Sequence, residues 1–219
     1  MRPISFPGTF EDSDGMETLT WRIQSSDRSG WAGRYEIRTR IRDVDVWGVD
    51  FDGLEPDVAD PSVLRLNSAS EITQCVLTGD MPCTSEFAGQ RRPTTVRFEL
   101  DLREQTHRPT RDPSSLLLST VVDGATYAIT DDWFEDGAIR LDGALRPNHL
   151  VCCATCLFSD YSPYGHGLMG MRCHRDAKIQ YLAVRSKTDY MSVPVTEEVP
   201  ETYLCDEYAR RVPGTGYRG

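Results

Sequence analysis

The first 130 residues alternate between apolar and polar positions with the period of two that is typical of strands with one wet face. Three such predicted strands are Thr18 to Gln24, Arg34 to Arg42 and Thr95 to Arg103. Two more, Ser115 to Val122 and Ala125 to Thr130, flank Asp123-Gly124, which favours a type I′ hairpin turn. Because no helical segment separates the strands, we expect a largely antiparallel sheet or sandwich.

The alternation changes parity at Trp47-Gly48. Val44 and Val46 occupy the apolar positions before this dipeptide, whereas Val49 and Phe51 occupy them after it. One inserted residue reverses the face of every later side chain, and glycine tolerates the resulting kink. The pattern therefore predicts a β-bulge at Trp47-Gly48.

A helical period follows at about residues 131–146, where apolar residues recur at Phe134, Ala138, Leu141 and Leu145. Asp132 could cap this helix with Glu135 reaching back to it, and Pro147 lies past its end. We expect this helix to close a β-rich domain of residues 1–148. Residues 149–219 would form a cysteine-rich module packed on that domain, with a short strand at His149 to Cys152 and a second helix from just after Cys173 to about Val184. The predicted class is α+β.

Four cysteines of the predicted module have the spacing of a metal site. Cys153 and Cys156 form a C-x2-C knuckle, and Cys173 and Cys205 follow after sixteen and thirty-one intervening residues. Tetrahedral zinc takes four sulfur or nitrogen ligands, and an all-cysteine site has no open position for a substrate. We expect a structural zinc site, with an iron-sulfur cluster as the alternative metal group.

The three other cysteines bear on that assignment. Cys152 adjoins Cys153, and because neighbouring side chains of an extended segment point to opposite sides, only one of the two would join the site. The spacing to Cys156 favours Cys153, although Cys152 stays open as a replacement. Cys75 and Cys83 are predicted to be buried small hydrophobic residues.

A polar loop, Ser159 to Gly167, lies beside the predicted metal site and supplies the candidate catalytic residues. His166 could act as an acid or base near neutral pH, and Asp160, Tyr161 and Tyr164 are its candidate partners. The same side chains often satisfy the backbone of a loop, so a purely architectural role is also open.

These segments resemble an uncharacterised, largely actinobacterial family whose members carry a domain of unknown function. The resemblance covers residues 132–219 and is weaker upstream. It is carried by the knuckle "CATC", the loop "SDYSPYGHG", a third cysteine before a helix, "ETYLC" and the terminal "PGTGYRG". The resemblance implies that the four cysteines act as a unit, but it implies no activity.

Charge and hydropathy exclude several classes of protein. The formal net charge is −10, and residues 150–219 hold eight basic and eight acidic side chains, so the excess lies upstream. Nucleic-acid binding needs a basic surface, which this balance opposes. The chain has no apolar run long enough to span a membrane and no secretory leader pattern, so we expect a cytoplasmic address.

Taken together, the sequence favours a zinc-stabilised binding protein with an unknown protein partner. An acidic protein would suit a basic partner, as in the immunity proteins that mask toxins, because complementary charge raises association rates. A metal-containing enzyme that uses the Ser159 to Gly167 loop is the alternative function, and an iron-sulfur redox protein is the third.

Overall fold

A computed structural model describes residues 1–26, 34–103, 116–164 and 167–217. Within these ranges ten strands pair into one sheet in the order β5-β4-β3-β2-β1-β6-β7-β8-β9, with β10 paired to β6. Its strands are β1 (Ile4–Asp12), β2 (Gly15–Ser25), β3 (Tyr35–Ile41), β4 (Val44–Gly48), β5 (Glu55–Pro56), β6 (Val76–Phe87), β7 (Gln90–Asp101), β8 (Leu116–Val122), β9 (Ala125–Asp131) and β10 (His149–Leu150). All pairs are antiparallel, which confirms the predicted α+β class.

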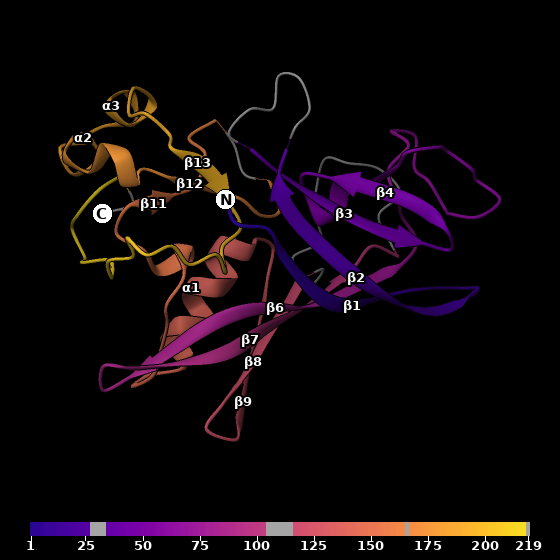
Figure 1. Cartoon of the computed structure of the whole chain (residues 1–219), viewed down its shortest axis with the longest axis horizontal. Coiled ribbons are helices and arrows are strands. Elements are labelled where there is room, and N and C mark those ends of the chain that lie inside the picture. Colours follow the sequence, from indigo (N-terminus) through magenta and orange to yellow (C-terminus); the bar gives the residue numbers. More distant parts are fainter. Residues whose placement is uncertain (27–33, 104–115, 165–166, 218–219) are drawn as a thin grey trace.

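The sheet has two halves that cross at a narrow junction, as Figure 1 shows. Strands β1–β5 form one half and β6–β9 the other, joined by four residue pairs between β1 and β6. Gly8 and Gly79 face each other there. A Cβ on Gly8 would lie 2.2 Å from the Thr78 carbonyl oxygen, and one on Gly79 would lie 2.4 Å from the Phe98 ring. The close crossing therefore requires glycine on both strands.

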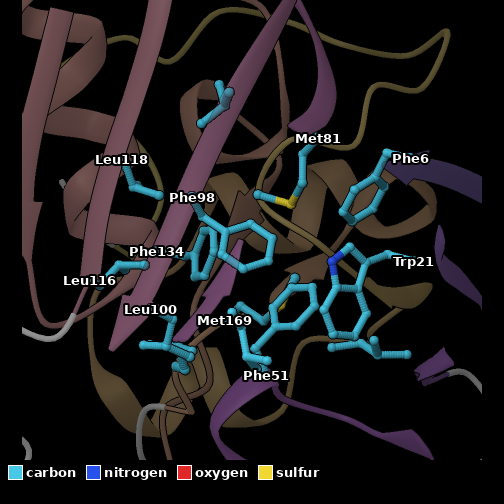
Figure 2. Close-up of a cluster of buried hydrophobic side chains, with 14 of the residues drawn as sticks. Phe6, Trp21, Phe51, Met81, Phe98, Leu100, Leu116, Leu118, Phe134 and Met169 are labelled. Carbon is cyan, nitrogen blue, oxygen red and sulfur yellow. The ribbon is translucent and has the colours of Figure 1, made fainter. Parts of the chain in front are cut away.

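The main core lies between the two halves and the helix α1 (Phe134–Ala144). Figure 2 shows its aromatic centre, in which Trp21, Phe51, Phe98 and Phe134 come from four different elements. The ring centroids of Phe51 and Phe98 are 4.4 Å apart, and those of Phe98 and Phe134 are 5.6 Å apart. These contacts fix the short helix η1 (Phe51–Gly53) and the start of α1 against the sheet.

Helix α1 has the buried face that its period predicts, since Phe134, Ala138, Leu141 and Leu145 are all in the core. The predicted cap is wrong. Trp133 occupies the N-cap position without a side-chain hydrogen bond, and the Phe134 N–H donates instead to the Leu168 carbonyl at 2.9 Å. A tertiary contact thus replaces the cap that Asp132 was expected to provide.

The C-terminal segments form a smaller layer that packs on the main sheet. A three-stranded sheet of β11 (Ser159–Asp160), β12 (Met171–Cys173) and β13 (Glu197–Val199) is its centre. Around it lie the short helices η2 (Cys153–Thr155), η3 (Arg175–Ala177), α2 (Lys178–Leu182) and α3 (Lys187–Met191). Figure 1 shows this layer above α1, with the N-terminal end of the chain beside β13.

Most predicted elements are confirmed. The strands match β2, β3, β7, β8 and β9, apart from Ser115, which lies outside the described residues. Asp123 and Gly124 have φ values of 52° and 81°, as a type I′ turn requires. The predicted bulge is wrong, because β3 and β4 pair without interruption up to Gly48 and the chain then turns into η1. The single helix expected after Cys173 is broken into η3 and α2.

Candidate functional site

A pocket of about 200 Å³ lies where the first half of the sheet, α1 and the C-terminal layer meet. Its acidic lining residues are Asp50, Glu135, Glu198 and Glu201, its basic ones are Arg34 and Arg172, and its aromatic ones are Tyr35, Trp133 and Tyr161. Val49, Ser162 and the segment 167–170 complete the lining. Residues from widely separated parts of the chain therefore build this one concave site.

Two carboxylates hold the 167–170 segment by its backbone. Asp50 accepts from the N–H groups of Leu168 and Met169, at 2.5 and 3.2 Å. Glu201 accepts from the N–H of Gly170 at 2.7 Å. A Cβ on Gly167 would lie 2.5 Å from the Asp50 carboxylate, and Gly170 has a φ of +122°, so both glycines are needed for this wall of the pocket.

Glu201 is the most unusual group in the lining. Its side chain is 1 % exposed, and its second carboxylate oxygen, Oε2, has no hydrogen-bond partner among the described residues. Burial raises the pKa of Glu201 to about 8, and the neighbouring Glu135 carboxylate adds to this shift, while the Gly170 N–H opposes it. The carboxyl is therefore mostly protonated at neutral pH.

The lining also contains an incompletely satisfied cation. Arg172 Nη1 is buried and has no hydrogen-bond partner within the described ranges. Arg172 lies on β12 opposite Asp160 and Glu198, and its guanidinium group is 5.9 Å from the ring centre of Tyr164. Arg34 pairs with Glu198 at 3.5 Å, so these two charges largely offset each other.

The pocket raises the pKa of Tyr35 as well. Burial is the main cause, and the negative charges of Asp50, Glu201, Glu198 and Asp52 add to it. An anionic phenolate is thus disfavoured at this position, which is expected of a site with excess negative charge. Tyr35 remains a neutral hydroxyl beside the Gly170 backbone.

The candidate loop residues have different environments. Tyr161 lines the pocket, whereas Tyr164 is 70 % exposed and outside the lining. Asp160 is fully buried, where it accepts from the Tyr181 hydroxyl at 2.8 Å and from the Tyr161 N–H at 3.0 Å. His166 lies outside the described residues. The loop thus contributes directly to the pocket through Tyr161, Ser162 and Gly167.

Asp160 belongs to a buried aromatic network. His174 stacks on Tyr181 with ring centroids 5.0 Å apart, and its ring nitrogens contact the Pro194 carbonyl and the Tyr190 hydroxyl. Burial lowers the pKa of His174, which favours the neutral imidazole. These contacts satisfy the polar atoms of the network and indicate a structural role for it.

Three of the four cysteines of the predicted metal site share one small cluster, and Cys156 is the C-cap of the helix η2 that begins with Cys153. Cys153 and Cys173 share a small hydrophobic cluster with Met171, Val199 and Tyr203, and Cys205 packs against it. Burial raises the pKa of the Cys153 thiol, with smaller effects from the other cysteines of the site. Within the described chain, however, no three His, Cys, Asp or Glu side chains are arranged closely enough to hold a metal ion.

Burial raises the pKa of the Cys156 and Cys173 thiols, and nearby N–H donors oppose this shift. The Phe158 N–H donates to Cys156 Sγ at 3.5 Å, and an Arg175 guanidinium N–H approaches Cys173 Sγ at 3.6 Å. Backbone N–H groups of Ala209 and Arg175 also point to Cys156 and Cys173 respectively. Such donors stabilise sulfur that carries negative charge, as a metal ligand does. The donor set therefore fits zinc in its chemistry.

Cys152 and Cys153 belong to different clusters. Cys152 packs in the main core with Cys83, whereas Cys153 faces the small cluster of the C-terminal layer. Cys75 is fully buried and Cys83 is 8 % exposed, so their predicted burial is confirmed. This separation favours Cys153 over Cys152 as a member of the four-cysteine group.

Sequence reasoning missed the carboxylates of the pocket. A helical wheel could have identified Glu135, because Glu135 and Asp142 are seven residues apart and both lie on the buried flank of α1. Glu201 follows β13 in a turn, where the Tyr203 N–H donates to the Pro200 carbonyl, and no periodic pattern marks it. Asp50 lies between β4 and η1 and resembles an ordinary turn residue, so tertiary structure alone reveals its role.

The fold and the site define a β-rich α+β protein with an acidic, aromatic-lined pocket. The chain belongs to a family of unknown function, DUF6304, whose model matches residues 4–159. This match confirms the resemblance to a family of that kind, although it extends upstream of the motifs that suggested it and ends before Tyr161. Searches of curated proteins and of solved structures found no match. No helix in the described part of the chain is both long and apolar enough to cross a bilayer.

Proposed function

We propose that this protein is a zinc-stabilised binding protein whose pocket accepts a basic side chain, lysine or arginine, of a protein partner. One observation carries the proposal: the buried Glu201 carboxylate lines the pocket with an oxygen that lacks a partner among the described residues. A buried polar atom of this kind costs about 1 to 3 kcal/mol, which a bound donor would recover.

The charges of the lining support a cationic ligand. Once the Arg34–Glu198 pair is set aside, Asp50 and Glu135 stand against the single guanidinium of Arg172, and Glu201 adds a third carboxylate when it ionises. Aromatic rings at Tyr35, Trp133 and Tyr161 add faces that attract cations. The net charge of −10 would also steer a basic partner toward the protein.

The protonation of Glu201 gives this proposal a specific pH dependence. The free carboxyl has a pKa of about 8, and a bound cation would lower that pKa by favouring the carboxylate. Binding therefore releases a proton below pH 8. Affinity should rise by up to about tenfold per pH unit between pH 6 and 8 and level off above pH 8.

Blocked tripeptides that contain a central lysine, arginine or glutamate provide the test by calorimetry at pH 6, 7 and 8.5. We expect the two basic peptides to bind, with the stated rise in affinity, and the glutamate peptide not to bind. Glu201→Gln should weaken binding and abolish its pH dependence. Glu99→Gln, which changes an exposed carboxylate of β7, is the matched control. Preferential binding of the glutamate peptide would mean that Arg172 dominates the site and would overturn the proposal.

The zinc part of the proposal is supported by the shared cluster of Cys153, Cys173 and Cys205, by the electrostatic effect of Cys156 on Cys153, and by the N–H donors around two of the sulfur atoms. Zinc would close the C-terminal layer as a structural ion and thereby fix the segment that carries Glu201. The seven thiols are all free, which suits the cytoplasm as the proposed location.

Metal content per chain, measured on protein purified without added metal, tests this part separately. One colourless zinc per chain is the expected result. Stoichiometric iron with brown absorbance would favour the iron-sulfur redox alternative, and protein without metal would remove zinc from the proposal. The peptide-binding result does not depend on which of these outcomes is found.

An enzyme is the second candidate, and the raised pKa of Glu201 favours it. A carboxyl that is protonated at neutral pH beside a second carboxylate, Glu135, could donate a proton while its neighbour accepts one. In this candidate mechanism Glu201 takes the role of acid or base that the sequence analysis assigned to His166. His166 lies outside the described residues. The enzyme candidate requires that Glu201→Gln abolish turnover of a substrate whose binding is retained.

A further inference from the structure

Cys83 and Cys152 occupy opposite positions on neighbouring extended segments. In the pairing of β10 with β6, His149 faces Glu86 and Leu150 faces Ser85. The Val151 N–H then donates to the Thr84 carbonyl at 2.8 Å, which continues the same register by one residue. The next pair in this antiparallel series is Cys152 and Cys83.

The hydrogen bond between Val151 and Thr84 also defines the type of pair that follows. Hydrogen-bonded and non-hydrogen-bonded pairs alternate along an antiparallel ladder, so the two cysteines form a non-hydrogen-bonded pair. The Cα atoms of such a pair are about 4.5 Å apart, which falls within the usual range of about 4.4 to 6.8 Å for a disulfide. Backbone geometry therefore permits the bond without rearrangement.

The two side chains lie close together. Both belong to the main core, and each thiol shifts the pKa of the other. Cys83 is 8 % exposed and Cys152 is 1 % exposed, so Cys83 is the more accessible of two buried thiols. Neither thiol faces the small cluster that contains Cys153 and Cys173.

We propose that Cys83 and Cys152 are a site of reversible oxidation that forms an intramolecular disulfide by exchange with a low-molecular-weight disulfide such as oxidised glutathione. One thiol of the pair, as its thiolate, attacks the oxidant and forms a mixed disulfide, which releases one glutathione thiolate. The other thiol, as its thiolate, then attacks the protein sulfur of that mixed disulfide and releases the second glutathione. Two protein thiols are oxidised and one glutathione disulfide is reduced to two thiols, so electrons and atoms balance.

The disulfide would link the main sheet covalently to the segment that leads into the C-terminal layer. Cys83 lies on β6 of the main sheet, and Cys152 directly precedes η2, the helix that begins with Cys153. Oxidation would therefore connect the C-x2-C knuckle to β6 by a covalent bond. It would not involve any of the four cysteines of the predicted metal site. This inference does not depend on the proposed pocket function.

The full-length protein tests the proposal directly. After incubation with oxidised glutathione and alkylation of the remaining thiols in denaturant, peptide mass spectrometry should find Cys83 linked to Cys152, so that the free thiols fall from seven to five. A thiol reductant should restore all seven. Cys83→Ser and Cys152→Ser should each abolish the linked peptide, while Cys75→Ser, at a fully buried cysteine, should retain it.

Two results would overturn the inference. One is full alkylation of Cys83 and Cys152 after prolonged exposure to the oxidant. The other is a linked peptide that joins Cys152 to Cys153 or Cys156 instead of Cys83. Because the linked peptide is sought in the wild-type protein, the test does not depend on whether a cysteine variant folds.

Discussion

The hydroxyl of Tyr181 donates to the Asp160 carboxylate at 2.8 Å, and both side chains are completely buried. Tyr181 lies on α2 and Asp160 on β11, so this single bond ties the helical part of the C-terminal layer to its small sheet. A hydrogen bond to a buried charge is worth more than one between neutral groups.

Removing this hydroxyl should destabilise the protein. Tyr181→Phe removes one hydrogen bond to the buried Asp160 carboxylate, so we expect the free energy of unfolding to fall by about 1.5 to 3 kcal/mol. Urea denaturation measures the loss. Tyr164→Phe, which alters a tyrosine that is 70 % exposed, should change stability by less than about 0.5 kcal/mol. Equal effects of the two variants would contradict the structural role of the buried pair.

Glu201 should make stability depend on pH. Its pKa is about 8 in the folded protein and 4.5 without the fold, so folding takes up a proton between these values. The protonated carboxyl is fully stabilising below pH 4.5, and that contribution is lost as pH rises through 8. The loss amounts to about 1.4 kcal/mol per pH unit in this window.

Glu201→Gln removes this titration, because glutamine stays neutral and can still accept from Gly170. Relative to the wild type, the variant should gain stability steadily from pH 5 to pH 8 and remain level above it. Thermal unfolding at four pH values measures the difference. A constant difference at all pH values would show that Glu201 titrates normally.

Two glycines of α1 should respond to alanine in opposite directions. A Cβ on Gly137 would lie 2.7 Å from the Leu118 side chain on β8, whereas a Cβ on Gly143 would meet nothing within 4 Å. Gly143→Ala should stabilise the protein by up to about 1 kcal/mol through helix propensity. Gly137→Ala should destabilise it by about 1 to 3 kcal/mol because the helix must move away from the sheet. Stabilisation by both variants in chemical denaturation would show that α1 packs more loosely than the structure indicates.

Removal of the proposed zinc should act locally. Treatment with a strong chelator should raise hydrogen exchange in β11, β12 and β13, while β7 and β8 stay protected by the aromatic core. Exchange mass spectrometry with and without the chelator makes the comparison. Uniform protection after verified loss of the metal would mean that the C-terminal layer holds itself together without zinc.

The individual strands and the hairpin turn of the main sheet could be predicted from the sequence. The junction where β1 crosses β6 could not. Strands β2 and β7 show strict alternation because one face of each is wet, and Asp123-Gly124 specifies its own turn. Strand β6 has no such alternation at Val76–Gly79, since all four residues are buried where β1 crosses it. A period of two detects a half-buried strand and fails for one that is covered on both faces.

In the candidate site, too, features set by neighbouring residues could be predicted, whereas features that depend on distant segments could not. The knuckle at Cys153 and Cys156 is a local motif, and its sequence neighbours predict its turn. The pocket brings together Asp50, Glu135 and Glu201 from three distant segments, and each of these residues looks ordinary in its own context. Their relationship depends on how the C-terminal layer packs on α1, which no spacing rule encodes.

The pairing of β10 with β6 has a consequence for how this chain can be divided. Residues 1–148 contain β6 but lack the segment that covers its far edge at Ser85 and Glu86. A truncated fragment would present those backbone groups as an open template on which another chain could add a strand. Expression of the β-rich part by itself should therefore produce aggregates, and a usable fragment should extend at least through Cys152.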